Sequence, residues 1–223
     1  MLLDEGLDGL EHVSLREGLV EAAVGDRLAV QRADCRGVAR LDLDDRAGGS
    51  QQLLRLEGGA GETAQFGKGD IGILNYALTL EYLETAFYAD VAKSGLFKGA
   101  ELQAIEKFGE EEAEHVAALT AAVKQLGGKP APEPKTEFPL ESAMQVVELA
   151  GTVENLGAAA YLGQAPRIQS KTVLASALAI HTVEGRHAAL LNSVVGKTIV
   201  PDGAFAKPAS MAQVLPKVKP FLA

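Results

Sequence analysis

Residues 110–119 read EEEAEHVAAL, a helix-forming stretch that crowds four glutamates against His115, one of only four histidines in the chain. Over residues 99–126, one face of the expected helix carries residues at heptad spacing: Ile105, Phe108, Glu112, His115, Leu119, Ala122 and Leu126. The stripe is apolar except for Glu112 and His115, so we expect both side chains to point into a core. The neighbouring Glu110, Glu111 and Glu114 fall largely on outer faces, where we expect them in solvent.

A second helix is expected at 171–195 and repeats this pattern. Its stripe is Val173, Ala177, Ile180, Glu184, His187, Leu191 and Val194. Glu112 with His115 and Glu184 with His187 are both Glu-x-x-His, a spacing that places both side chains on one helical face. One such motif is a weak signal, but two at mid-helix seam positions are a strong one. His181 lies one turn before Glu184, and we expect it on the helix flank rather than as a further ligand.

Two other helices are expected at 71–93 and 142–163, and each directs a glutamate inward. These are Glu81 and Glu154, each followed seven residues later by a tyrosine on the same face, Tyr88 and Tyr161. Glu84 competes with Glu81, and we favour Glu81 because its spacing to Tyr88 repeats that of Glu154 to Tyr161. The two phenols are either ordinary core aromatics or hydrogen-bond donors to the inward carboxylates.

The connections predict the topology of an all-α bundle. Short loops join the first helix to the second and the third to the fourth, so each pair is an antiparallel hairpin. Between the hairpins lies GGKPAPEPKTEFPLE, which in extended form reaches ~45 Å and exceeds the length of a 22-residue helix. A crossover along the bundle is therefore feasible. Asp70 is expected to cap the first helix, and the Pro-rich C-terminal tail is expected to wrap the bundle with a short helix at SMAQVL.

The four inward glutamates lie near the midpoints of their helices and should share one layer to within ~3 Å. Four buried carboxylates cannot stay ionised without compensation, whereas two divalent ions balance their charge and accept two imidazoles. This donor set is known from di-iron and di-manganese carboxylate bundles, and it suits iron or manganese better than structural zinc. The expected metal ligands are Glu81, Glu112, His115, Glu154, Glu184 and His187.

Composition excludes other classes of protein. The chain has 223 residues, 47% of them apolar, and a net charge of −9, which argues against a nucleic-acid partner. No apolar run approaches the ~20 residues of a membrane helix, so no membrane partner is expected. Cys35 is the only cysteine and cannot form an internal disulfide.

A change in basic residues marks a boundary. Residues 1–67 contain seven arginines and no lysine, whereas residues 68–223 contain twelve lysines and two arginines. We interpret 1–67 as a poorly ordered extension and 68–223 as the bundle with its tail. The start, MLLDEGLDGLEH, is acidic where a secretory signal is basic. The sequence as written therefore favours a cytoplasmic location, whereas a true start that carries a signal would mean export.

Several stretches resemble the bacterial ferritin-like domain family that also includes plant desiccation-related proteins. They are LNYALTLEYLETAFY, EEAEHVAALTAAVKQLGGKP, VENLGAAAYLGQAP and HTVEGRHAALLNSVVG, and the resemblance covers about 68–223. It implies a ferritin-like four-helix bundle with a di-iron site formed by the six residues named above. It implies no particular substrate.

Three functions remain open at this point. The first is a redox protein in stress protection that oxidises Fe(II) or reduces O2 or peroxide, with the metal ions and the oxidant as its partners. The second is a non-enzymatic desiccation or stress protein, a structural bundle with a bound metal. The third is a manganese catalase-like activity. A homo-oligomer is compatible with all three, and an iron-storage cage is weakly supported because the tail does not read as a long fifth helix.

Overall fold

The chain folds into long helices as the sequence predicts. The structure is a computed structural model and describes residues 65–223. The helices are α3 (Gly69–Lys93), α4 (Gly99–Gln125), α5 (Ala143–Gln164), α6 (Lys171–Val194) and α7 (Met211–Val218), with short 3₁₀ turns at Ala165–Arg167 and Lys219–Phe221. The all-α class is confirmed, and the four long helices agree with the expected ones to within two residues at each end. The predicted extension at 1–67 falls almost wholly outside the described residues.

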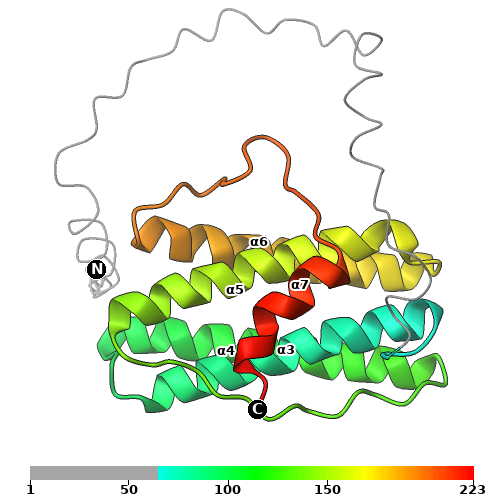
Figure 1. The fold of residues 1–223 in the computed structure, drawn as a ribbon, viewed down its shortest axis with the longest axis horizontal. Coiled ribbons are helices and arrows are strands. Elements are labelled where there is room, and N and C mark those ends of the chain that lie inside the picture. The colour runs from blue at the N-terminus through cyan, green and yellow to red at the C-terminus, as the bar shows by residue number, and fades with distance from the viewer. Residues whose placement is uncertain (1–64) are drawn as a thin grey trace, which may run out of the picture. The chain divides into compact units, whose positions relative to one another are not determined.

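Two antiparallel hairpins make the bundle, α3 with α4 and α5 with α6 (Figure 1). The segment between α4 and α5 runs the length of the bundle, as its proline content led us to expect. It begins beside the N-terminal half of α3, where the side chain of Asn75 binds the carbonyl of Lys129 and the amide of Ala131 at 3.1 and 2.8 Å. Near its end the ring of Phe138 packs edge-on against Phe87, late in α3, with ring centroids 5.2 Å apart.

Asp70 does not cap α3, contrary to the expectation from sequence. The N-cap position of α3 is Lys68, which makes no side-chain capping bond. The Asp70 carboxylate instead accepts hydrogen bonds from the backbone amides of Gln169 and Ser170, at 2.9 and 2.8 Å, just before α6 begins. A carboxylate at a helix N-terminus is favoured by the free amides and the helix dipole, whichever helix supplies it. Asp70 therefore ties the starts of α3 and α6 together.

The C-terminal tail crosses the outside of α5 and α3, with α7 as its short helix (Figure 1). Met211, Val214 and Val218 of α7 are at most 3% exposed and belong to one apolar cluster with residues of α3 and α5. Before α7 the backbone of Ala209 comes so close to α5 that a Cβ on Gly163 would lie 1.9 Å from the Ala209 carbonyl oxygen. Only glycine permits this contact, which fixes where the tail crosses the bundle.

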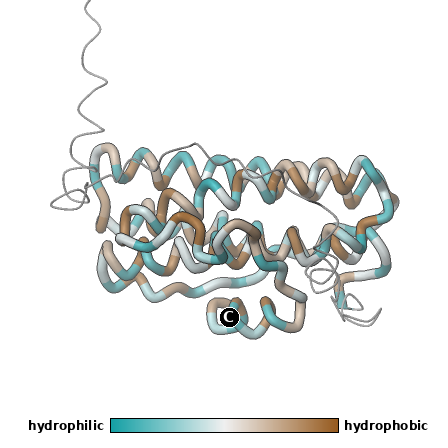
Figure 2. The backbone as a smooth tube through the Cα atoms, turned by 90° about the horizontal axis from the view of Figure 1, so that it is seen from above, coloured by the Kyte–Doolittle hydropathy of each residue, from teal (hydrophilic) through white to brown (hydrophobic). Residues whose placement is uncertain are grey.

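Apolar packing fills the bundle on either side of its middle. One cluster lies toward the start of α3 and includes Leu78, Leu119 and Ile180, and another lies toward its end and includes Phe87 and Val146. Figure 2 shows the apolar positions recurring along each helix between polar ones. Between these clusters, buried glutamates from all four long helices lie at one level, and they form the candidate site described below.

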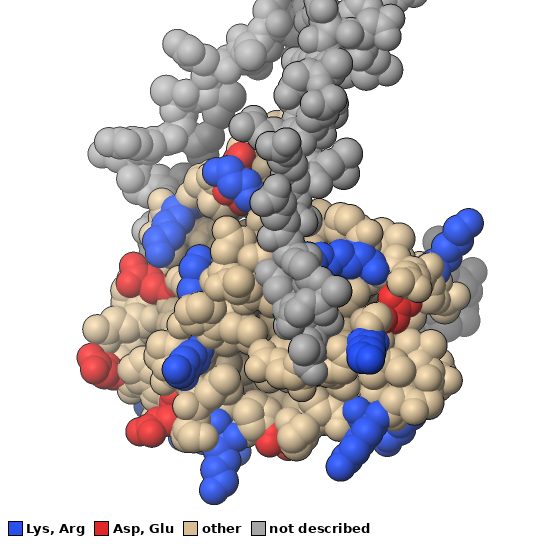
Figure 3. Space-filling model, turned by 45° about the vertical axis from the view of Figure 1, so that its right-hand side comes forward, with Lys and Arg blue, Asp and Glu red and all other residues tan. Residues whose placement is uncertain are grey.

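One face of the described chain is mixed in charge. On the face that Figure 3 presents, Lys and Arg side chains are interspersed with Asp and Glu side chains. None of the helices within residues 65–223 combines the length and the apolar character needed to cross a membrane.

The Asn75 side chain makes three hydrogen bonds that close one end of the bundle, to the carbonyls of Phe66 and Lys129 and to the amide of Ala131. We expect Asn75→Ala to lower the free energy of unfolding by about 2 kcal/mol, because it leaves buried backbone groups unpaired. Urea titration measures this, with Gln103→Ala on the exposed side of α4 as the control. A change below about 0.5 kcal/mol would contradict the role of Asn75 in anchoring the crossover.

Candidate metal centre

The six residues predicted as metal ligands come together at the middle of the bundle. They form two groups whose donor atoms lie within 4.8 Å of one another. The first group is Glu81, Glu112, His115 and Glu184, and the second is Glu112, Glu154, Glu184 and His187. Glu112 and Glu184 belong to both groups, so the two Glu-x-x-His glutamates lie between the two candidate positions for an ion. The four glutamates are completely buried.

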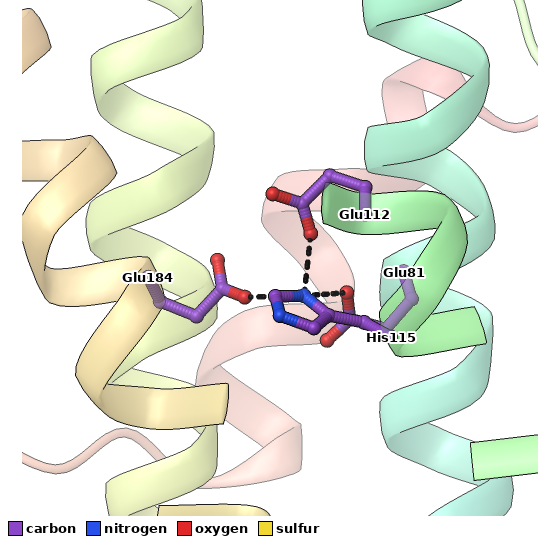
Figure 4. Close-up of side chains that lie close together, drawn as sticks. All are labelled: Glu81, Glu112, His115 and Glu184. Atoms are coloured by element: carbon purple, nitrogen blue, oxygen red, sulfur yellow. Dashed lines mark hydrogen bonds and ion pairs between the residues drawn. The ribbon is translucent and has the colours of Figure 1, made fainter. Parts of the chain in front are cut away.

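His115 faces the first group with its Nδ1 atom (Figure 4). That nitrogen lies 2.8 Å from Glu112, 3.2 Å from Glu81 and 3.2 Å from Glu184. In Figure 4 the four side chains converge from α3, α4 and α6 on one small volume. One imidazole nitrogen and three carboxylates directed at one point are a donor set for a divalent ion such as iron or manganese.

His187 faces the second group in the same way and has an additional partner. Its Nδ1 lies 3.0 Å from Glu112 and 3.4 Å from Glu154, while its Nε2 lies 2.7 Å from the carboxylate of Glu111. The prediction that Glu111 is solvated is therefore wrong, since it holds the outer nitrogen of His187. The sequence places Glu111 on the flank of α4, but it does not reveal that the other Glu-x-x-His helix comes within reach of that flank.

The two tyrosines bond across the bundle. Tyr88 of α3 donates to Glu154 of α5, and Tyr161 of α5 donates to Glu81 of α3. The phenols thus contact the inward carboxylates as one of the two interpretations required, but each contacts the glutamate of the opposite helix. Both tyrosines are almost fully buried, at 3% and 7% exposure. Each bond fixes the orientation of one carboxylate that belongs to a single group.

Glu84 is a fifth buried carboxylate at this level, at 2% exposure. It belongs to neither group of possible ligands, whereas Glu81 belongs to the first. The glutamates have room because α5 carries Gly157 here: a Cβ on that residue would lie 2.9 Å from Glu84 Oε1 and 3.5 Å from Glu184 Oε2. His181 lies apart from the site, with its Nδ1 3.0 Å from the Ala158 carbonyl oxygen.

The donor atoms fit a bound cation better than they fit each other. Glu154 Oε2, both Glu184 oxygens and His187 Nδ1 are buried and, within the described chain, lack a partner in hydrogen-bond geometry. They nevertheless lie close to their neighbours, as with the 3.4 Å between His187 Nδ1 and Glu154 Oε2. Buried polar atoms normally have partners, so atoms that converge without bonding indicate a shared ligand. The cluster can hold a metal ion.

Comparison with known families gives one finding: the ferritin-like domain matches residues 69–197. The match covers more than half of the chain and contains all six converging residues. The chain belongs to the ferritin-like domain family. A search of curated proteins found no match.

The ferritin-like centre has strongly coupled charges. Burial lowers the pKa of each histidine, but the close approach of the surrounding glutamates outweighs it and raises the pKa of His115 to about 12 and that of His187 to about 11. Burial raises the pKa of Glu81 to about 7. Burial raises the pKa of Glu112 as well, yet the nearby nitrogens of both histidines bring that pKa down to about 2. Without a metal, the two imidazolium groups therefore neutralise part of the carboxylate charge.

Two further glutamates and the two tyrosines of the centre have raised pKa values. Burial, followed by repulsion from neighbouring glutamates, raises the pKa of Glu84 and of Glu184 well above the ordinary value. The same causes raise the pKa of Tyr88 and Tyr161, so both phenols keep their protons at neutral pH. Both tyrosines are thus hydrogen-bond donors to the inward carboxylates of Glu154 and Glu81.

A matched pair of substitutions tests the space around the carboxylates. Gly157→Ala should displace Glu84 and Glu184, whereas Gly185→Ala adds a methyl where no atom lies within 4 Å. We expect Gly185→Ala to stabilise the protein by up to about 1 kcal/mol. Gly157→Ala should cost about 1–3 kcal/mol relative to it and should lower metal binding. Urea unfolding and metal titration measure both effects, and equal stabilisation by the two variants would contradict the close packing at Gly157.

Metal uptake should release protons. Both histidines are protonated at pH 7 in the metal-free protein, and a metal binds only the neutral imidazole. Loading two ions should therefore release at least about two protons, and their combined affinity should fall by at least about a hundredfold for each unit by which the pH is lowered. Calorimetry of Mn(II) binding in buffers of different ionisation enthalpy measures this, with His181→Gln as the control. A heat of binding that does not depend on the buffer would contradict the prediction.

Proposed function

We propose that this ferritin-like domain binds two iron ions and oxidises Fe(II) with O2 or peroxide. The observation that carries the proposal is the pair of four-residue groups that share Glu112 and Glu184. Two ions that shared these two carboxylates would be close enough for one small oxidant to reach both. When bound, the two ferrous ions would supply one electron each to that oxidant.

The chain's own residues have distinct tasks in this proposal. Glu112 and Glu184 would bridge the two ions. Glu81 with His115 would complete one position, and Glu154 with His187 the other. Four glutamate charges then match two divalent ions, and this removes the cost of several kcal/mol that each unpaired buried carboxylate carries.

The surrounding residues orient these ligands and exclude water. Tyr88 and Tyr161 donate to Glu154 and Glu81, which leaves the second oxygen of each carboxylate for an ion. The Glu111 carboxylate accepts from Nε2 of His187, so the proton resides on that nitrogen and Nδ1 is left to bind. The apolar clusters on either side leave the four glutamates completely buried, so bulk water is kept from the site and every charge interaction within it is strengthened.

Iron is preferred over manganese as the proposed metal because Fe(II) is far more readily oxidised by O2 at neutral pH than Mn(II). The same ligands suit manganese, and a manganese-loaded form that evolves oxygen from peroxide would make the domain catalase-like instead. The resemblance to desiccation-related proteins supports stress protection as the setting, where removal of Fe(II) and peroxide limits oxidative damage.

Metal content and oxidation rate test this proposal directly. We expect the full chain, purified without chelator, to contain about two iron or manganese atoms, and we expect the Glu112→Ala/Glu184→Ala double variant to lose both. Inductively coupled plasma mass spectrometry gives the content. Stopped-flow absorbance after anaerobic Fe(II) loading and exposure to air gives the oxidation rate. Glu110→Ala/Glu114→Ala on the exposed faces of α4 is the matched control.

Each outcome distinguishes the candidates. Fe(II) oxidation well above the buffer rate, lost in the double variant and kept in the control, supports the oxidase. Two bound ions without faster oxidation would leave the structural, metal-containing bundle. A folded chain that takes up no Fe(II) would contradict both.

A further inference from the structure

The two halves of the metal centre repeat each other along α4 and α6, but the repeat breaks at two positions. Four residues before the glutamate of each Glu-x-x-His motif stand Phe108 in α4 and Ile180 in α6. One residue before that glutamate stand Glu111 in α4 and Val183 in α6. The α4 copy thus offers an aromatic ring and a carboxylate where the α6 copy offers two smaller aliphatic side chains.

This difference closes one half of the centre and leaves the other more open. The ring of Phe108 stacks on His187 with centroids 4.0 Å apart and planes 21° apart, and Glu111 holds the outer nitrogen of the same histidine. His187 is 5% exposed as a result. His115 receives neither kind of cover from α6, and its side chain is 12% exposed.

A pocket of about 160 Å³ lies on the open side, between the C-terminal half of α4 and the first half of α6. Its buried floor includes Leu119, Val173, Ala177 and Ile180. Its more exposed rim includes Ala122 and Ser176. None of the side chains that line the pocket is charged. The Ser176 hydroxyl donates to the Thr172 carbonyl oxygen, which leaves its own oxygen free to accept a hydrogen bond.

The pocket adjoins the metal centre. Leu119 follows His115 by four residues on α4, and Ile180 precedes Glu184 by four residues on α6. Residues four apart on a helix lie on the same face one turn apart, so the floor of the pocket is one turn from two ligands of the first group. A molecule seated there is separated from that group by a single layer of aliphatic side chains.

We propose that this pocket, called here the α4–α6 pocket, binds a short alkyl hydroperoxide and delivers it to the His115 side of the centre. The size fits, since an apolar cavity of about 150 Å³ accepts a molecule of six carbon atoms. The lining fits as well. Its aliphatic side chains would contact the alkyl group, and the hydroxyl of Ser176 and the side-chain amide of Gln125 would contact the polar end. The absence of charge from the lining disfavours carboxylates, phosphates and amines, which would lose their hydration without gaining a partner.

This inference rests on the proposed function, because the centre must hold two ferrous ions. The hydroperoxide takes two electrons, one from each Fe(II), and two protons. Its O–O bond breaks, giving one alcohol, one water and two Fe(III). A single turnover needs no other reductant.

Binding is tested first, with tert-butanol as a probe that cannot be reduced. Amide NMR of the full chain should show saturable shifts for Ala118, Ala122 and Ser176 on titration. Ala122→Phe and Ser176→Leu fill the pocket from opposite helices and should each abolish the shifts, while Ala121→Phe on the exposed side of α4 should keep them. Shifts that grow linearly without saturation in the unmodified chain would overturn the proposal, whatever the iron chemistry proves to be.

The reaction is tested next by single-turnover oxidation of the Fe(II)-loaded chain. With tert-butyl hydroperoxide, the rate should fall about tenfold or more in Ala122→Phe and Ser176→Leu, but not in Ala121→Phe. With hydrogen peroxide, the rate should change by less than about twofold in all three, because hydrogen peroxide needs no alkyl site. Equal loss with both oxidants, or loss with neither, would overturn the role in hydroperoxide delivery. If the chain binds tert-butanol but does not oxidise Fe(II) with any of the oxidants, the proposed function is refuted. The pocket would then remain established as a binding site.

Discussion

The structure depends on one constraint: five carboxylates are buried at one level of an apolar bundle. Glu81, Glu84, Glu112, Glu154 and Glu184 are each at most 2% exposed. Ionised and unpaired, each would cost several kcal/mol, which is comparable to the whole stability of a domain. Two imidazolium groups and raised pKa values offset this charge in the metal-free chain, and two divalent ions would offset it more completely.

The rest of the fold keeps that layer dry and in register. The apolar cluster around Leu78 closes one end of the layer and the cluster around Phe87 closes the other. The helices belong to two separate hairpins, so contacts made by the connecting segments set the position of one hairpin along the bundle axis relative to the other. Asp70 joins the start of α3 to the start of α6, and the tail crosses both hairpins where Gly163 admits it. Such contacts far from the layer determine whether its carboxylates meet.

The helices, their order and the six converging residues were predictable from sequence because each follows from spacing along one helix. Heptad stripes place Glu and His on a buried face whichever helix lies opposite. What the sequence did not reveal depends on which helices adjoin. Tyr88 and Tyr161 contact the glutamate of the opposite helix, Glu111 reaches a histidine on α6, and Asp70 binds the backbone just before α6 rather than capping its own helix. Glu84 is one turn from Glu81, and spacing alone could not show that both are buried.

Approximate twofold repetition explains why the centre can form. The imperfection of the repeat explains why its two halves differ in how closely they are covered. Two copies of one helix pair supply matching glutamates, histidines and tyrosines, so short, repeated motifs would suffice to hold a symmetrical pair of ions. In a fully symmetrical site, the two ion positions would be equally exposed to solvent or equally shielded from it. By placing Phe108 and Glu111 over His187 and smaller aliphatic residues at the equivalent positions of α6, the chain closes one half and leaves an uncharged pocket beside the other. On this proposal, side-chain size at two positions would determine access to the centre, with no change in the residues that would bind the ions.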